Sequence, residues 1–200
     1  MPRLVATTTA LIRRFARESR GAAAVEFAIV AIPMLTMMFG VLELALILLV
    51  TSTLDSATDF AARNIRTGEF QNANPVKSEA DIEVTRTEFA KLVCRNMTWL
   101  QGGCEGKLIV EAETFDTFAG AGGSEPADPQ NNPSAPCWSV GAPEDIVLVR
   151  TYYEWQIISP LLQPIFQSAG RDGKRLLTSA RIFSNEPYNA ALTPRGAACV

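Results

Sequence analysis

The chain has 200 residues and a formal net charge of −3 at pH 7, which is enough for one ordinary domain plus an anchor, without the basic excess that nucleic-acid binding requires. It contains no histidine, so it lacks both the usual general base near neutral pH and the commonest zinc ligand. No pair of acids and no Cys-x-x-Cys motif stands at a catalytic or metal-binding spacing, so the sequence predicts no catalytic residues, no metal site, no cofactor and no enzyme.

Residues 1–21 form a basic leader that runs directly into an apolar segment. The leader carries one acid, Glu18, against five arginines, which are Arg3, Arg13, Arg14, Arg17 and Arg20. Lys and Arg are enriched on the cytoplasmic side of membrane helices. We therefore expect the N-terminus to stay in the cytoplasm and the chain after the apolar segment to reach the periplasm.

Residues 22–50 are apolar except for two acids, Glu26 and Glu43. A helix of that length is about 44 Å long, whereas the hydrocarbon core of a bilayer is about 30 Å thick. A secretory signal peptide would have a shorter apolar stretch, of about 7–15 residues, with its cleavage site after that stretch. The sequence therefore predicts one transmembrane helix over 22–50, in a single-pass protein of the inner membrane.

The two acids are costly within such a helix. A charged residue at the bilayer centre costs roughly 2.5–3.5 kcal/mol on insertion scales, so each acid needs an interface, a proton or a partner. Cleavage after Gly21 would place a new α-amino group on Ala22, one helical turn from the Glu26 carboxylate. In the alternatives, Gly21 is an ordinary helix-boundary glycine and Glu26 extends to the cytoplasmic interface. Glu43 either marks the periplasmic edge or faces a partner helix.

The string Gly21-Ala-Ala-Ala-Val-Glu26-Phe27, preceded by arginines and followed by Ala-Ile-Val-Ala-Ile-Pro33, resembles the processing site of type IV pilin-like proteins. It is most similar to that of the TadE/TadG-like pseudopilins of the tight-adherence (Flp) pilus. The resemblance continues through Asp55-Ser-Ala-Thr-Asp-Phe-Ala-Ala-Arg63 and Gly68, and returns at Asn185-Glu-Pro-Tyr188. It implies that a prepilin peptidase cleaves between Gly21 and Ala22 and removes the leader, and that Glu26 and Phe27 serve in assembly.

Residues 51–68 are expected to continue the helix beyond the membrane. The residues that fall at helical spacing on its inner face are Leu54, Ala57, Thr58, Ala61 and Ile65. Asp59 and Arg63 are expected to form an ion pair one turn apart. Gly68 supplies a C-terminal stop, so the pattern predicts one helix from the leader to about Thr67.

Residues 69–200 are expected to form a periplasmic α+β domain, a small antiparallel sheet packed with helices. A helix over 78–98 begins with a capping box of Ser78 and Asp81. Alternating apolar and polar residues predict strands over 107–115, 146–158 and 176–184, with a turn at Asp172-Gly173 before the last. The Gly- and Pro-rich stretch 119–136 is expected to be a mobile loop, and a partner-binding loop is the alternative.

All four cysteines follow the apolar segment, which fits an oxidising compartment. Cys94 and Cys104 are the best local pair, because the glycines between them let the chain turn back. A disulfide between Cys137 and Cys199 follows only by elimination. A zinc site is the rival interpretation, weakened by the lack of histidine and of paired Cys-x-x-Cys motifs.

These features and the resemblance together predict a minor pseudopilin that takes part in biogenesis of a tight-adherence pilus. The expected partners are the membrane, a prepilin peptidase, and other pilins or pseudopilins of the same system, and the protein could enter a surface pilus. The alternative is a membrane-anchored periplasmic binding or sensor module outside any filament, whose helix is only a tether. Removal of the leader and co-purification with sheared filaments would separate the two.

Overall fold

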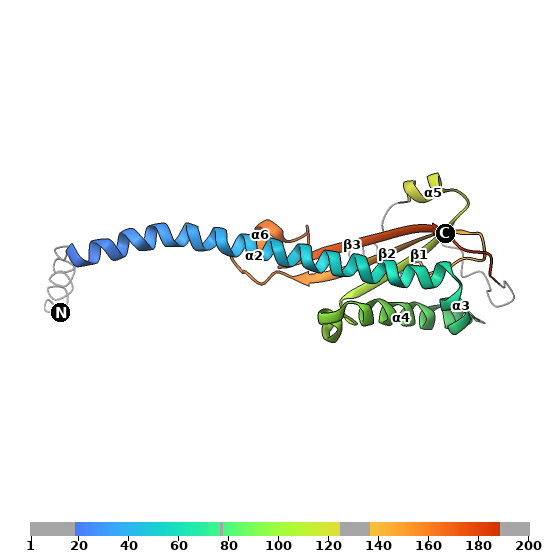
Figure 1. Cartoon of the computed structure of the whole chain (residues 1–200). Helices are drawn as coiled ribbons and strands as arrows, with labels where there is room; N and C mark the ends of the chain where they lie inside the picture. The colour runs from blue at the N-terminus through green and yellow to red at the C-terminus, as the bar shows by residue number, and fades with distance from the viewer. Residues whose placement is uncertain (1–18, 77, 125–136, 189–200) are drawn as a thin grey trace, which may run out of the picture. The chain divides into compact units, whose positions relative to one another are not determined.

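The computed structural model describes residues 19–76, 78–124 and 137–188. The chain divides into two compact units, Met1–Ala45 (unit 1) and Leu46–Val200 (unit 2). The border falls within helix α2, which runs from Ser19 to Arg66 (Figure 1). Most of the predicted leader, over 1–18, lies outside the described residues.

The described part of unit 1 is helical and strongly apolar. Large apolar side chains that are more than half exposed recur along it, namely Val25, Phe27, Ile29, Val30, Ile32, Met34, Met37, Val41 and Leu42. A contiguous exposed apolar surface of this kind marks an interaction with lipid or protein. α2 is long and apolar enough to cross a membrane, and one such N-terminal helix fits a single-pass membrane protein.

Unit 2 contains the rest of α2 and a small α+β fold (Figure 1). The further elements are α3 (Glu69–Ala73), α4 (Glu79–Asn96), the 3₁₀ helix η1 (Thr98–Gly103), β1 (Leu108–Phe115), α5 (Phe118–Gly123), β2 (Ile146–Gln156), α6 (Gln163–Phe166) and β3 (Lys174–Ser184). The predicted fold class is confirmed, and the three strands and two long helices lie where the periodicity of the sequence indicated.

The sheet is antiparallel, with the order β1-β2-β3. β2 is the central strand, and its residues pair with β1 from Leu108↔Tyr153 to Phe115↔Ile146. Its pairing with β3 runs from Gln156↔Lys174 to Ile146↔Ser184. The central position explains why β2 has an almost continuous run of buried residues, since both of its edges and both of its faces are covered.

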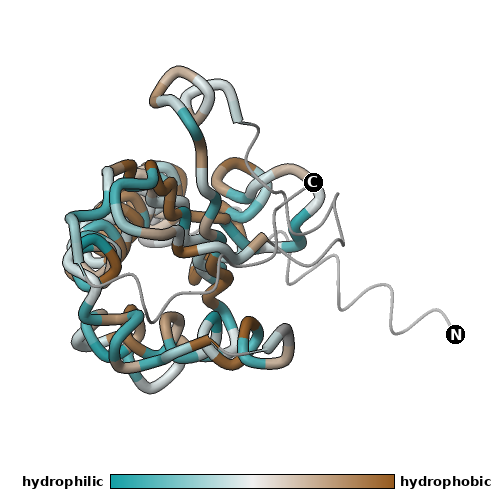
Figure 2. The backbone as a smooth tube through the Cα atoms, turned by 90° about the vertical axis from the view of Figure 1, so that its right-hand side faces the viewer, coloured by the Kyte–Doolittle hydropathy of each residue, from teal (hydrophilic) through white to brown (hydrophobic). Residues whose placement is uncertain are grey.

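The core lies between one face of the sheet and the two long helices. α2 contributes Leu54, Ala57, Ala61 and Ile65, α4 contributes Phe89 and Val93, and the strands contribute Val110, Val147, Val149 and Tyr153. Both hydrophilic (teal) and hydrophobic (brown) residues occur along the backbone of unit 2 (Figure 2), and on α4 the buried Phe89 and Val93 lie one turn apart on one face, as in an amphipathic helix. Ile47 and Val50 also belong to this core, so the end of the apolar segment 22–50 is buried by protein in unit 2.

The predicted capping box at the start of α4 and the predicted glycine stop after α2 are both present in the structure. The Ser78 backbone N–H donates to the Asp81 carboxylate at 2.8 Å, which satisfies an otherwise free group at the start of α4. Gly68 has φ +78° and ends α2 in the left-handed conformation. The prediction that Asp59 pairs with Arg63 is wrong. The Asp59 carboxylate instead forms an ion pair with Arg181 of β3 at 3.2 Å. Packing of α2 on the sheet brings that arginine within reach.

The stretch expected to be a loop begins with a helix. Residues 118–123 form α5, whose start is capped by Thr117, with the Gly120 N–H donating to the threonine hydroxyl at 3.1 Å. Ala121 is buried, so contacts with the sheet stabilise a glycine-rich sequence that has little helix propensity of its own. Residues 125–136 of the predicted loop lie outside the described residues.

The predicted disulfide between Cys94 and Cys104 is present, with the two Cα atoms 5.6 Å apart. It joins the last turn of α4 to the residue after η1 and lies in the core. Cys137 is also disulfide-bonded. Cys199 lies outside the described residues, so its pairing with Cys137 stays a prediction.

Candidate functional site

The predicted processing and assembly residues lie on the first turns of α2. Gly21 is followed by a continuous helix through Glu26 and Phe27. The Glu26 side chain is exposed, and that of Phe27 is 71% exposed. Glu26 lies four positions after Ala22 in the helix, a rise of about 6 Å. An amino group on residue 22 would therefore lie one turn from the carboxylate, on the same face of the helix.

Gly21 stands in open space, because a Cβ built on it would meet no atom within 4 Å. Its φ is not in the left-handed region, since the positive-φ glycines of the described chain are all in unit 2. Neither packing nor backbone conformation in the monomer explains a glycine here.

Glu43 differs from Glu26 in its surroundings. Only 2% of it is exposed, and it makes an interaction within the protein, while its neighbours Leu42 and Leu44 are exposed. Desolvation of a carboxylate is tolerable only when it is paired or hydrogen-bonded. Neither sequence alternative for Glu43, a position at the periplasmic edge or contact with a partner helix, included burial within its own chain.

The chain after β3 contacts the end of α2 and the start of α3. Arg66, near the end of α2, forms an ion pair with Glu186 at 3.0 Å, and the Glu186 N–H donates to the Arg66 carbonyl at 2.9 Å. The Gln71 amide donates to the Tyr188 hydroxyl at 3.0 Å. These contacts hold the chain after β3 against the end of α2, so Glu186 and Tyr188 have a structural role here.

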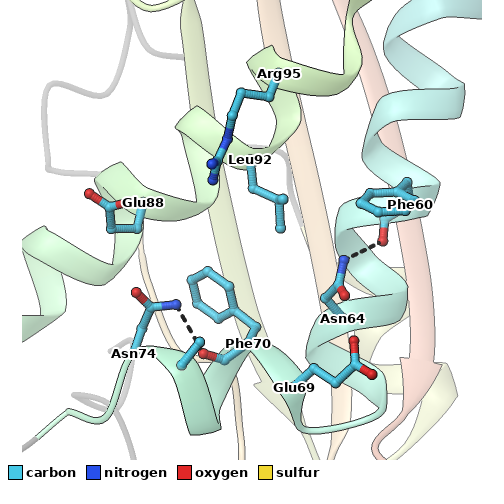
Figure 3. A pocket seen from close by; sticks show the side chains of 9 residues that line it. Phe60, Asn64, Glu69, Phe70, Asn74, Glu88, Leu92 and Arg95 are labelled. Atoms are coloured by element: carbon cyan, nitrogen blue, oxygen red, sulfur yellow. Dashed lines mark hydrogen bonds between the residues drawn. The ribbon is translucent and has the colours of Figure 1, made fainter.

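Unit 2 has a pocket of about 430 Å³ between α2, α3 and α4 (Figure 3). Its lining consists of Phe60, Asn64, Glu69, Phe70, Ala73, Asn74, Glu88, Leu92 and Arg95. Both amide side chains are used within their own helices, since Asn64 donates to the Phe60 carbonyl and Asn74 to the Phe70 carbonyl, each at 3.1 Å. The lining offers an apolar floor and charged rim groups, which suits binding, and it contains no cysteine, serine or threonine nucleophile.

The charged rim of this pocket is held by an ion pair on α4. Lys91 donates to the Glu88 carboxylate at 2.8 Å. This hydrogen bond and the charge of Lys91 lower the pKa of Glu88, and the same interaction raises the pKa of Lys91. Both groups therefore stay charged near neutral pH, and neither is poised to transfer a proton.

A second polar cluster lies within the sheet, on the face away from α2 and α4. Glu111 and Arg150 are 3% and 5% exposed and lie 3.5 Å apart, Oε2 to Nη1. Tyr152 donates to the same Glu111 oxygen at 2.8 Å, and Arg150 donates to the Ser124 carbonyl at 2.8 Å. Burial, and then the hydrogen bond to Glu111, raise the pKa of Tyr152. Its groups are mutually satisfied, so the cluster is structural.

Within the described residues, no group of three or more Cys, Asp or Glu side chains could hold a metal ion. Sequence reasoning found the residues of the α2 segment, but it missed the pocket and the buried cluster. The α4 pattern around Phe89 did indicate one buried face, yet the pocket depends on how α3 turns back against it.

The chain has an N-terminal apolar helix joined to a small α+β unit. This arrangement fits the class of single-pass membrane proteins. A family model described as TadE-like protein matches residues 21–63. The match begins at Gly21 and includes Glu26 and Phe27, so the resemblance is confirmed over α2, and it suggests a protein associated with the tight-adherence pilus. Comparisons of the chain with curated proteins and with solved structures gave no match.

Proposed function

We propose that the protein is a minor pseudopilin of a tight-adherence pilus, cleaved after Gly21 by a prepilin peptidase. It is inserted in the inner membrane with its N-terminus in the cytoplasm and unit 2 in the periplasm. The observation that supports this most is the TadE-like match, which starts at the proposed cleavage position and covers Glu26 and Phe27. The disulfide between Cys94 and Cys104 agrees with an oxidising compartment for unit 2.

The proposed role of Glu26 follows from its place on an apolar, exposed helix. A carboxylate among lipid chains gains from any counter-charge within reach. After cleavage, the nearest counter-charge on the chain is the α-amino group of Ala22, one turn away. The amino group of a neighbouring subunit, packed alongside through residues such as Phe27, can neutralise the same carboxylate. The acid then favours lateral association of helices in the membrane.

N-terminal sequencing tests the processing step. The protein purified from membranes of cells with an active prepilin peptidase is expected to begin at Ala22, and protein from peptidase-deficient cells at Met1. Gly21→Leu is expected to abolish cleavage while leaving the helix intact, because Gly21 has open space around it. An N-terminus at Met1 in the presence of the peptidase would refute the proposal.

Glu26→Gln tests the assembly step. The variant is expected to insert and to be cleaved normally, while its amount in sheared pili falls roughly 3- to 30-fold, for a polar interaction of about 0.6–2 kcal/mol in the membrane. Glu105→Gln is the matched control, since it neutralises an exposed acid of unit 2 outside the pocket and is expected to leave piliation unchanged. Normal incorporation of the Glu26→Gln protein would remove the assembly role.

The pocket between α2, α3 and α4 favours a second candidate, a membrane-anchored periplasmic binding or sensor module. A cavity of about 430 Å³ is within the size range of small-molecule sites. For that function the leader would remain attached and the protein would be absent from sheared filaments. The sequencing and shearing experiments therefore discriminate between the two proposals.

A further inference from the structure

One end of unit 2 carries exposed apolar side chains that the core does not use. They come from the loop between β2 and β3, where Ile158, Leu161 and Ile165 are 61%, 70% and 71% exposed. The loop is otherwise ordered by its own contacts, since Leu162 is buried and the Ile157 N–H donates to the Gly173 carbonyl at 2.9 Å. A fixed loop that presents large apolar groups outward indicates a surface that is covered in the cell.

The contacts of α2 with β3 show which end of unit 2 this is. Going backward along α2, Arg66 contacts Glu186, Asp59 contacts Arg181, and Asp55 accepts from Ser179. The residue numbers fall together along both elements, so α2 and β3 run parallel. The first turn of α2 in unit 2, from Leu46, consequently lies toward the start of β3, which is the end that carries the β2–β3 loop with α6 (Figure 1).

Other residues at this end have the composition of a membrane interface. Trp99 of η1 is 52% exposed and packs edge-on against Trp155 of β2, with ring centroids 6.5 Å apart. Lys107 and Lys174 flank the same end, since the Glu154 N–H donates to the Lys107 carbonyl and Lys174 stands opposite Gln156 in the ladder of β2 and β3. The Lys174 ammonium forms an ion pair with Glu154 at 3.1 Å. Tryptophan and lysine are the residues that anchor proteins at the boundary between lipid and water.

We propose that the β2–β3 loop is a second membrane contact, which inserts Leu161 and Ile165 into the outer leaflet of the bilayer that α2 crosses. Leu46 is the first residue of unit 2, and the helix over 22–45 that precedes it is about 36 Å long, enough to cross a core of about 30 Å. The end of unit 2 that holds Leu46 must then lie at the membrane surface. The occupant of the apolar surface is phospholipid.

This inference rests on α2 spanning a bilayer and is independent of leader cleavage and of entry into a pilus. An apolar group at the interface enters to about 5–10 Å, at the boundary of headgroups and acyl chains. With two attachments, the transmembrane helix and the loop, unit 2 cannot rotate freely about the axis of α2. The loop would be withdrawn from lipid if the protein left the membrane.

The test uses the full chain with Leu161→Trp, reconstituted at low protein-to-lipid ratio in vesicles of phosphatidylethanolamine and phosphatidylglycerol. The acyl chains are unmodified or brominated close to the headgroup, and the signal of the unsubstituted protein is subtracted. Ile165→Trp gives a second position. The control is Phe118→Trp, because Phe118 is 55% exposed on α5, at the opposite end of the sheet (Figure 1).

We expect bromine to quench the Leu161→Trp and Ile165→Trp proteins roughly threefold more than the Phe118→Trp protein, with blue-shifted emission, as for a side chain at the interface. A Phe39→Trp variant reports whether α2 is inserted. If its tryptophan is quenched while positions 161 and 165 behave like position 118, the loop faces water or a protein partner and the proposal is wrong. If position 39 is not quenched either, the membrane anchor itself fails, which also overturns the proposal.

Discussion

Gly68→Ala is the substitution whose effect the structure specifies most fully. Gly68 has φ +78°, a conformation that costs an L-residue about 1–2 kcal/mol. A Cβ there would also lie 2.5, 2.7 and 2.9 Å from three carbon atoms of the Tyr188 ring. These separations are far below van der Waals contact, so the ring has to move.

Displacement of that ring adds a second term to the cost. The Tyr188 hydroxyl accepts from Gln71 at 3.0 Å and from Asn185 at 3.3 Å, and each hydrogen bond contributes about 0.5–1.5 kcal/mol. Together with the backbone strain, we expect Gly68→Ala to lower the free energy of unfolding of unit 2 by about 2–4 kcal/mol.

Denaturant unfolding of the full chain in detergent, followed by tryptophan fluorescence, measures this change. Gly106→Ala is the matched control, because a Cβ at Gly106 meets no atom within 4 Å and its φ is not positive. A surface substitution of that kind is expected to change the free energy of unfolding by no more than about 0.5 kcal/mol.

A Tyr188→Ala background separates the two terms. With the ring absent, Gly68→Ala retains only the backbone cost of about 1–2 kcal/mol, so the two substitutions should couple by about 1–2 kcal/mol. An equal cost in both backgrounds would show that the ring does not oppose a Cβ, and no cost in either would refute the whole account of this turn.

Further predictions concern the buried groups of unit 2. Arg150→Met leaves the Glu111 carboxylate buried without its ion pair, and we expect it to lower the free energy of unfolding by about 3–5 kcal/mol. Adding Glu111→Gln should recover most of that loss. Denaturant unfolding of the single and double variants measures both effects, and a loss that Glu111→Gln does not recover would contradict this account. Replacing both Cys94 and Cys104 by serine is expected to lower the free energy of unfolding by about 3 kcal/mol for a loop of this size. The measurement is denaturant unfolding under oxidising conditions, and a change below about 1 kcal/mol would be evidence against this stabilisation. Burial raises the pKa of all three tyrosines, Tyr152, Tyr153 and Tyr188. Their contribution to stability is therefore complete below about pH 10, the unfolded pKa, and is lost as the pH rises above it. Ultraviolet titration should accordingly show tyrosinate in the folded protein only above that pH, and an ordinary titration of any tyrosine would contradict the assigned burial.

Several features of this protein could be read from local sequence because their causes are local. The charge asymmetry of the leader and the length of the apolar run specify a candidate membrane helix without any long-range contact. The capping box at Ser78, the glycine stop after α2 and the period-two alternation of the strands act over a few residues. The short spacing of Cys94 and Cys104 likewise favoured the disulfide that is present.

Where the prediction differed, the cause was contact between distant segments. Asp59 was expected to pair with Arg63 on its own helix, but β3 brings Arg181 to it. The helix α5 forms in a glycine-rich stretch because the sheet covers Ala121. Glu111 and Arg150 lie at polar positions of the alternating strands, and only the structure shows that these two side chains are buried.

The sequence by itself determined which segments are apolar and which are helical or extended, since each depends on neighbours within a few residues. The tertiary structure alone decided the partners of the charged side chains, the pocket between α2, α3 and α4, and the end of unit 2 at which the apolar β2–β3 loop lies. These depend on the parallel packing of α2 against β3 and the residues that follow it, which joins residues more than a hundred positions apart. No local pattern encodes that register, because it is set by the complementary surfaces of the whole core.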